Sequence, residues 1–206
     1  MKILLVSATE AEIFPIIQRI HGAGIKNHQL EVLITGVGMV ATAYSLGKHL
    51  AVTQYDLAIN AGIAGSFDRT LPLGEVVQVS EDVFAEMGAE DDDDFLPIDK
   101  LGFGESRMVS LPTNFQTDLT KVKAITVNRV HGNENTIYTI MNRFHPQIES
   151  MEGAAFFYSC NQAGIQSLQI RSISNYVERR NRENWNIGLA IKNLNDEIST
   201  WLEEQS

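Results

Sequence analysis

Short apolar runs alternate along this chain with longer stretches in which apolar residues recur at helical spacing, and this alternation constrains the fold more than any other feature. The predicted strands are residues 3–6, 31–34, 57–60, 76–79, 124–127 and 167–173, and the predicted helices are residues 11–20, 39–51, 135–143, 153–163 and 186–204. Several of these strands are apolar on both faces, which is typical of strands covered by helices on both sides. The pattern therefore predicts an α/β sandwich.

Composition limits the number of domains and the classes of partner. With 206 residues, 44% of them hydrophobic, and no break in composition, the chain is expected to form one domain over residues 1–206. The formal net charge of -10 opposes binding to phosphate backbones, so nucleic acid is not expected as a partner. The apolar run 2–6 is too short to span a membrane, and it lacks the cleavage site of a signal peptide. We expect a cytoplasmic protein with no membrane partner.

A single cysteine, Cys160, excludes a disulfide within the chain. It follows the bulky apolar residues Phe156, Phe157 and Tyr158, which favours a packed thiol over a reactive nucleophile. The cysteine usage also indicates a reducing compartment.

Two segments suggest ligand binding, but other features of the chain argue against it. Residues Gly36–Ala41 match the loose GxGxxA form of a dinucleotide fingerprint, yet a strand and a helix precede them and Asp56 comes before its strand. Their glycines still allow a tight turn into a helix whose N-terminal amides can face a polar group. The carboxylates of residues 90–94 favour a solvated loop over a metal site, because the spacing of an EF-hand is absent. We expect neither a metal nor a cofactor.

Four positions near predicted strand ends are candidates for a functional site. The glycine-rich segment Asn60–Ser66 is predicted as a turn at a carboxyl strand end, where open α/β sheets bind ligands. Glu12 begins the first helix just beyond the first strand, so its carboxylate should project into the same crevice. Glu152 opens a helix beside small residues, where an acidic side chain requires partners. Asn175 closes a late strand. Taken singly, each has an ordinary structural explanation, such as a plain turn or a surface carboxylate.

Together these segments resemble the nucleoside phosphorylase and nucleosidase superfamily over nearly the whole chain. The start through Glu12, the segment 60–65 and the pair Met151–Glu152 are similar to methylthioadenosine/S-adenosylhomocysteine nucleosidases, although Ile63 stands where those enzymes usually carry Ser. The resemblance implies a single-domain, three-layer α/β/α sandwich with a central mixed, twisted sheet, and a homodimer or larger homo-oligomer. It also implies that Glu12 activates the attacking water and that Met151 and Glu152 grip the ribose of a small-molecule nucleoside. The further substrate-binding residues expected on this basis are Ile63, Ala64, Gly65 and Val127.

Asn175 narrows the choice of base, because adenine-releasing relatives carry Asp at this place. An amide donates hydrogen bonds to N7 and to a 6-oxo group, whereas a carboxylate would face the oxo oxygen with its lone pairs. A 6-oxopurine such as hypoxanthine is therefore expected. Longer segments, residues 85–91, 126–132, 174–178 and 181–187, resemble the futalosine hydrolases, which free hypoxanthine from futalosine in menaquinone biosynthesis. By this resemblance we expect hydrolysis of the N-ribosidic bond of futalosine, with Arg179 or Arg180 as a partner for its benzoate.

Several alternatives stay open at this point. One is a nucleosidase for methylthioadenosine, S-adenosylhomocysteine or inosine. Another is a purine nucleoside phosphorylase, but the phosphate loop of such relatives is replaced here by Thr9–Glu12, whose carboxylates repel phosphate. A dehydrogenase rests on the weak glycine match alone, and a purine-binding protein without activity would not need Glu12.

Overall fold

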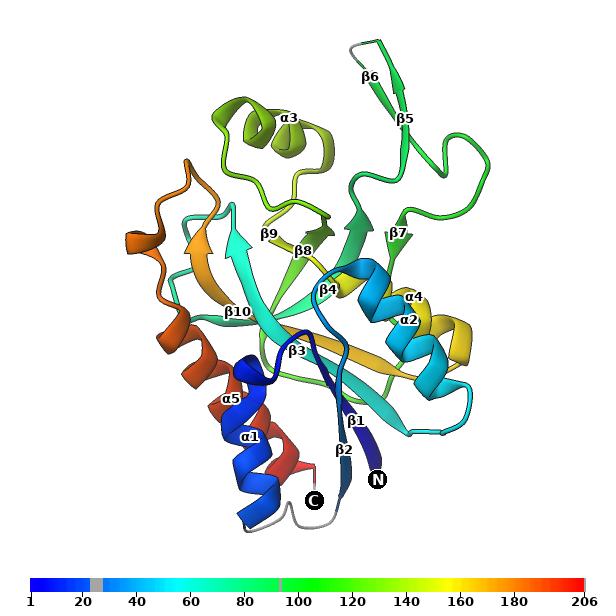
Figure 1. Cartoon of the computed structure of the whole chain (residues 1–206), viewed down its shortest axis with the longest axis vertical. Coiled ribbons are helices and arrows are strands. Elements are labelled where there is room, and N and C mark those ends of the chain that lie inside the picture. The colour runs from blue at the N-terminus through cyan, green and yellow to red at the C-terminus, as the bar shows by residue number, and fades with distance from the viewer. Residues whose placement is uncertain (23–27, 93, 206) are drawn as a thin grey trace.

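The structure is a computed structural model that describes residues 1–22, 28–92 and 94–205. In this part of the chain eight strands form one mixed sheet in the order β10-β4-β8-β9-β3-β1-β2, with β7 paired to β4 (Figure 1). These strands are β1 (Lys2–Ser7), β2 (Gln29–Ile34), β3 (Leu57–Ser66), β4 (Val76–Phe84), β7 (Arg107–Met108), β8 (Thr120–Thr126), β9 (Ile148–Ser150) and β10 (Ser167–Tyr176). A separate hairpin is formed by β5 (Gly88–Asp91) and β6 (Asp94–Pro97).

Strand β3 lies at the centre of this topology. It pairs in parallel with β1 and β10, and its last residues pair antiparallel with β9. Strand β10 also pairs with β4, which pairs with β8, which in turn pairs with β9. The strands β3, β10, β4, β8 and β9 therefore close into a ring, and β1 and β2 extend the sheet from one side of it.

Helices cover both faces of the sheet. The helices are α1 (Glu10–Gly22), α2 (Met39–Leu50), α3 (Glu134–Phe144), α4 (Gly153–Ala163) and α5 (Ile187–Glu204), with the short 3-10 helix η1 (Arg182–Asn184) before α5. In Figure 1, α1 and α5 lie on one side and α2 and α4 on the other. Alternate residues of β1 enter two different cores: Leu4 and Val6 pack with residues of α2 and α4, whereas Ile3 and Leu5 pack with residues of α1 and α5. The predicted three-layer α/β/α sandwich with a mixed sheet is confirmed.

Two local predictions are wrong, the second only in part. Residues Asn60–Ser66 do not form a turn, because β3 runs through to Ser66 and pairs with β10 from Ala58 to Ser66. The described carboxylates of the acidic run are exposed to solvent as predicted, but they do not form a loop throughout: Glu90 and Asp91 belong to β5 and Asp94 to β6, while residue 93 lies outside the described residues. In both places the backbone hydrogen bonds of a neighbouring strand outweigh the local preference of glycine and acidic residues for turns.

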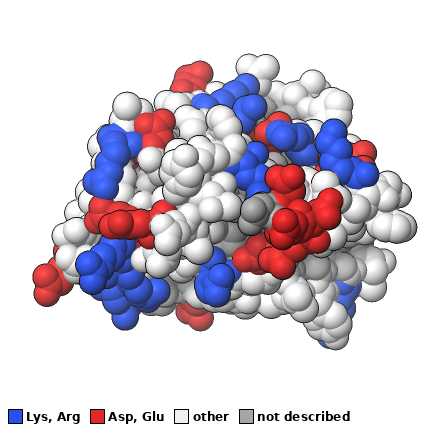
Figure 2. All heavy atoms as spheres, turned by 90° about the horizontal axis from the view of Figure 1, so that it is seen from above, with Lys and Arg blue, Asp and Glu red and all other residues white. Residues whose placement is uncertain are grey.

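Cys160 lies in α4 with no exposed surface, and burial raises the pKa of its thiol to about 12. The expected packed thiol is confirmed. Among the described residues, no helix is long and apolar enough to cross a membrane. Figure 2 views the molecule from above, where Lys and Arg form separate groups among Asp and Glu. The prediction that nucleic acid is not a partner remains a prediction.

Candidate active site

A cavity of about 310 Å³ opens at the carboxyl ends of β1, β3 and β10. Its walls include seven of the predicted site residues: Glu12, Ile63, Ala64, Gly65, Met151, Glu152 and Asn175. These residues come from α1, β3, β10 and the connection between β9 and α4, and they are up to 163 positions apart in the chain, from Glu12 to Asn175. The fold therefore brings the predicted carboxylates and the predicted amide to one place.

The carboxylate of Glu12 is held by four hydrogen bonds. Its Oε2 accepts from the Ser7 hydroxyl at 3.2 Å, the Thr9 hydroxyl at 2.8 Å and the Thr9 amide at 3.0 Å. Its Oε1 accepts from the amide of Ile63 at 3.1 Å. Because each carboxylate oxygen has two lone pairs, Oε1 keeps acceptor capacity toward the cavity.

Asn195 of α5 determines how the helix turn that carries Glu12 is shaped. Helix α1 is kinked at Ile13 and contains Pro15. The Asn195 amide group donates to the Glu12 carbonyl oxygen at 2.8 Å, and its Oδ1 accepts from the Ile16 amide at 3.2 Å. These are the two groups that an unbroken helix would join directly, four residues apart. The Asn195 side chain is therefore inserted into the hydrogen-bond ladder of α1 immediately behind Glu12.

Glu152 precedes α4 and turns its carboxylate toward the first turn of α2. Its Oε1 accepts from the Gly38 amide at 3.0 Å, and its Oε2 accepts from the Met151 amide at 3.3 Å. Gly38 has a φ of 96°, a conformation that favours glycine. The segment that resembles a dinucleotide fingerprint therefore provides an N-terminal helix amide, and this amide binds the protein's own carboxylate.

Behind Glu152 lies a buried arginine, Arg171, only 1% exposed. Its Nη1 lies 3.8 Å from Oε2 of Glu152, its Nε donates to Oε1 of Gln169 at 3.1 Å, and its Nη2 donates to Oδ1 of Asn60. A β-carbon on Gly62 would overlap the Arg171 guanidinium and approach Oε1 of Glu12 to 3.0 Å. Gly62 thus lets the cation lie against β3 between the two functional carboxylates.

The network continues from Gln169 to a buried aspartate. Asp82 accepts from the Gln169 amide group at 3.1 Å and from the Thr126 hydroxyl at 2.8 Å. Burial raises the pKa of Asp82 to about 6, against the lowering effect of these hydrogen bonds and of Arg171. A β-carbon on Gly153 would overlap both Asp82 and Gln169, so the first residue of α4 must be glycine for this network to pack.

Asn175 is oriented by its own strand. Its Nδ2 donates to the Tyr176 carbonyl oxygen at 3.1 Å, and its Oδ1 lies 2.8 Å from the Ser174 hydroxyl. One proton of Nδ2 is left to donate into the cavity. A bulge in β10 between Ile173 and Asn175 places Asn175 beside Gly65 of β3.

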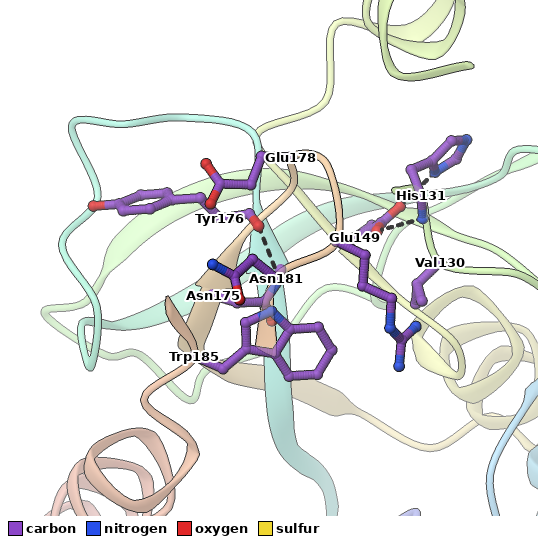
Figure 3. A pocket seen from close by; sticks show the side chains of 10 residues that line it. Val130, His131, Glu149, Asn175, Tyr176, Glu178, Asn181 and Trp185 are labelled. Carbon is purple, nitrogen blue, oxygen red and sulfur yellow. Dashed lines mark hydrogen bonds and ion pairs between the residues drawn. The ribbon is translucent and has the colours of Figure 1, made fainter. Parts of the chain in front are cut away.

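A smaller cavity of about 50 Å³ adjoins the first and shares Gly65, Val130, Glu149, Asn175 and Trp185 with it (Figure 3). Arg180 lines this smaller cavity, and its guanidinium lies 5.4 Å from the centre of the Trp185 ring. Arg179 is exposed and lines neither cavity. Val127 is fully buried in a cluster with Ile125 and Ile140, and Val130 is the valine that lines both cavities. The substrate contacts of these three predicted residues stay predictions.

Sequence reasoning missed Arg171, Asp82, Glu149, Trp185 and Asn195. Their partners are distant in the chain, such as Asn60, which is 111 positions from Arg171. One signal was available: Gln169 and Arg171 alternate with the apolar residues Leu168, Ile170 and Ile173 in a predicted buried strand, and buried polar residues of this kind require partners.

Comparisons with known proteins agree with this geometry. The family model described as the phosphorylase superfamily matches residues 8–201. The chain is 32% identical to the futalosine hydrolase of Streptomyces coelicolor over 193 residues, which covers 85% of this chain and 81% of that protein. The futalosine hydrolase structure from Helicobacter pylori superposes with a TM-score of 0.82 at 15% identity, covering 99% of this chain and 98% of that one. A 5′-methylthioadenosine/S-adenosylhomocysteine nucleosidase from Colwellia psychrerythraea in complex with adenine superposes with a TM-score of 0.81 at 19% identity, covering 98% and 94%.

Proposed function

The chain belongs to the phosphorylase superfamily, and on this premise we propose that it hydrolyses the N-ribosidic bond of futalosine and releases hypoxanthine and dehypoxanthine futalosine. One observation carries the reaction type: Glu12, Glu152 and Asn175 line a single cavity, with Glu12 held by four hydrogen bonds. The relative from Streptomyces coelicolor supports futalosine as the substrate. The reaction would belong to menaquinone biosynthesis in the cytoplasm, and the catalytic domain would comprise residues 1–206.

In the proposed reaction, cleavage builds positive charge on the ribose and negative charge on the departing base. Glu12 orients a water through Oε1 and removes its proton. Met151 and Glu152 fix the ribose hydroxyls, while the carboxylates of Glu12 and Glu152 stabilise the sugar cation. The one free N–H of Asn175 donates a hydrogen bond that is shared between N7 and O6 of the base. Because an amide is not an acid, the proton that the base finally takes up comes from water.

Hydrolysis is favoured over phosphorolysis by the charges in the cavity. Among the described residues that line it, Glu12, Glu149 and Glu152 are acidic and none is Lys or Arg. Arg171 lies behind the wall and already contacts Glu152. Three carboxylates without a cation on the surface oppose the binding of phosphate.

The deciding experiment is a product assay with futalosine, inosine and methylthioadenosine, each with and without inorganic phosphate. We expect free hypoxanthine and a free sugar product from futalosine, at a rate that phosphate does not change. A sugar phosphate as the product would identify a phosphorylase. Preferred release of adenine from methylthioadenosine would support the nucleosidase that is the second candidate.

We further propose that an arginine at the start of the segment before α5 pairs with the benzoate of futalosine. The two candidates are Arg180, which lines the smaller cavity, and Arg179, which lines neither cavity. Since inosine carries no benzoate, Arg180→Ala should lower kcat/KM for futalosine and leave inosine unchanged, with Arg179→Ala as the matched comparison. Equal losses on both substrates would remove the arginine from benzoate recognition.

A homodimer or larger homo-oligomer is also part of the proposal. The exposed apolar side chains Val40 of α2, Tyr158 of α4 and Phe103 line one apolar groove of about 460 Å³. Surfaces of this kind commonly mark contacts between proteins. Light scattering of the wild type and of Val40→Glu tests this, because a charge in the interface should shift the protein toward the monomer.

A further inference from the structure

Glu149 is a buried carboxylate to which the proposed reaction assigns no role. It is 3% exposed, yet it lines both the larger and the smaller cavity. Its Oε1 accepts from the main-chain amide of His131 at 2.9 Å, and its Oε2 lies 2.6 Å from Nδ1 of the same histidine (Figure 3). A carboxylate taken out of water requires such partners, but nothing in the core requires a carboxylate at this place.

The sheet places Glu149 and Asn175 on either side of one glycine. Gly65 of β3 pairs with Asn175 of β10 on one edge and with Glu149 of β9 on the other. Residues that are paired across strands point to the same face of a sheet. A β-carbon built on Gly65 would lie 3.0 Å from Cγ2 of Val177, 3.2 Å from Nδ2 of Asn175 and 3.6 Å from Cγ of Glu149, so the close approach of these side chains requires glycine. Gly65, Asn175 and Glu149 together line one part of the larger cavity, the Gly65 recess, in which an amide and a carboxylate flank bare backbone.

The two flanking groups have opposite hydrogen-bonding character. Asn175 has one N–H proton left to donate, as its other proton goes to the Tyr176 carbonyl oxygen. Glu149 can only accept, and two of its approximately four lone-pair positions are used by His131. The main-chain amide of His131 is itself consumed by Glu149. The recess thus offers a donor next to an acceptor.

We propose that Glu149 is a specificity-determining residue that accepts the N1–H proton of a 6-oxopurine base in the Gly65 recess, while Asn175 donates to its O6. This inference rests on the proposed function, because it concerns the base of the same substrate. A 6-oxopurine presents an acceptor, O6, beside a donor, N1–H, which matches the pair. A 6-aminopurine presents a donor beside a bare N1 lone pair, so that N1 would face the carboxylate without a proton between them. His131 is the positioning residue that fixes the carboxylate.

The test compares hypoxanthine-releasing and adenine-releasing reactions in one pair of variants. Glu149→Gln keeps the size of the side chain, but its amide can turn either its oxygen or its NH2 group toward N1. We expect kcat/KM for inosine and futalosine to fall about 10- to 100-fold, as for loss of a hydrogen bond to a charged group, while kcat/KM for adenosine stays equal or rises. The matched control is Glu178→Gln, a carboxylate of the smaller cavity that bonds Asn184 and Arg69 and lies outside the recess.

A second measurement compares two ligands that differ only at N1. Wild-type enzyme should bind hypoxanthine at least about 10-fold more tightly than 1-methylhypoxanthine, which lacks the N1 proton, and Glu149→Ala should reduce this ratio because it removes the acceptor and makes room for the methyl group. An unchanged ratio of inosine to adenosine in Glu149→Gln, with the wild type still preferring inosine, would overturn the role of Glu149 alone. A wild type that prefers adenosine would overturn the proposed function and this inference together.

Discussion

Replacing Asn195 by Ala tests whether the geometry of Glu12 depends on the side chain inserted behind it. The substitution removes the donor to the Glu12 carbonyl oxygen and the acceptor for the Ile16 amide. Asn195 is 3% exposed, so both main-chain groups are left without water. An unpaired buried polar group costs about 1 to 3 kcal/mol, so two such groups cost roughly 2 to 6 kcal/mol.

For a domain of this size, at about 2 to 4 °C per kcal/mol, that loss corresponds to a decrease in Tm of roughly 4 to 24 °C. The assays are urea unfolding for the free energy and steady-state hydrolysis for kcat. We expect kcat to fall more than KM rises, because the Glu12 turn moves while the walls that bind the ribose stay in place.

Asn193→Ala is the matched control on the same helix. Its amide group makes one hydrogen bond, to the Gly74 carbonyl oxygen at 2.8 Å, and it has no contact with α1 among the described hydrogen bonds. That variant should lose about 1 kcal/mol and keep its kcat. If Asn195→Ala is no less stable and no less active than Asn193→Ala, the inserted amide does not hold Glu12 in place.

Four further predictions follow from the same geometry. Glu12→Gln should lower kcat about 100- to 10,000-fold with substrate binding retained, and unchanged turnover would remove Glu12 from the chemistry. Asn175→Asp should shift the kcat/KM ratio at least about 10-fold from inosine toward adenosine, and a constant ratio would contradict the role given to the amide. Gly62→Ala should abolish most activity, because its methyl group would occupy the space of the Arg171 guanidinium. Activity near the wild-type level, or a crystal structure of the variant with Arg171 in its original place, would contradict this prediction. Burial raises the pKa of Asp82 in the folded state to about 6 from 3.8, so the contribution of this group to stability is present below about pH 4 and is lost as the pH rises through about 6. In urea unfolding, the free energy of unfolding should therefore fall by an amount on the order of 3 kcal/mol across this pH window. Asp82→Asn should not show this decrease.

The sequence predicted the layers of the fold well, because its apolar periodicity reflects burial directly. Helix α4 begins at Gly153 and ends at Ala163, as the spacing predicts. The extension of β3 through Ser66 was not predictable, since its glycines and alanines favour a turn and only the long-range pairing with β10 outweighs this preference. Strand β9 has three residues, too few to give a periodic signal.

Some residues of the candidate site are predictable from local sequence patterns, whereas others depend on partners far away in the chain. Glu12, Glu152 and Asn175 stand at element boundaries and resemble known motifs, so the sequence alone indicates them. Arg171 and Asn195 act through partners far away in the chain, and no local pattern reports such pairings. Gly38 was noticed for its motif, but its actual partner, Glu152, became apparent only in three dimensions.

The buried Cys160 has a practical consequence for experiments on this protein. It is the one cysteine of the chain, it has no exposed surface, and burial raises the pKa of its thiol to about 12. Maleimide and other thiol reagents require an accessible thiolate, so the folded protein should be nearly inert to them at neutral pH. A cysteine introduced at exposed Arg179 would then be the single reactive position, and a fluorophore attached there would report ligand entry into the neighbouring cavity without background from the native thiol.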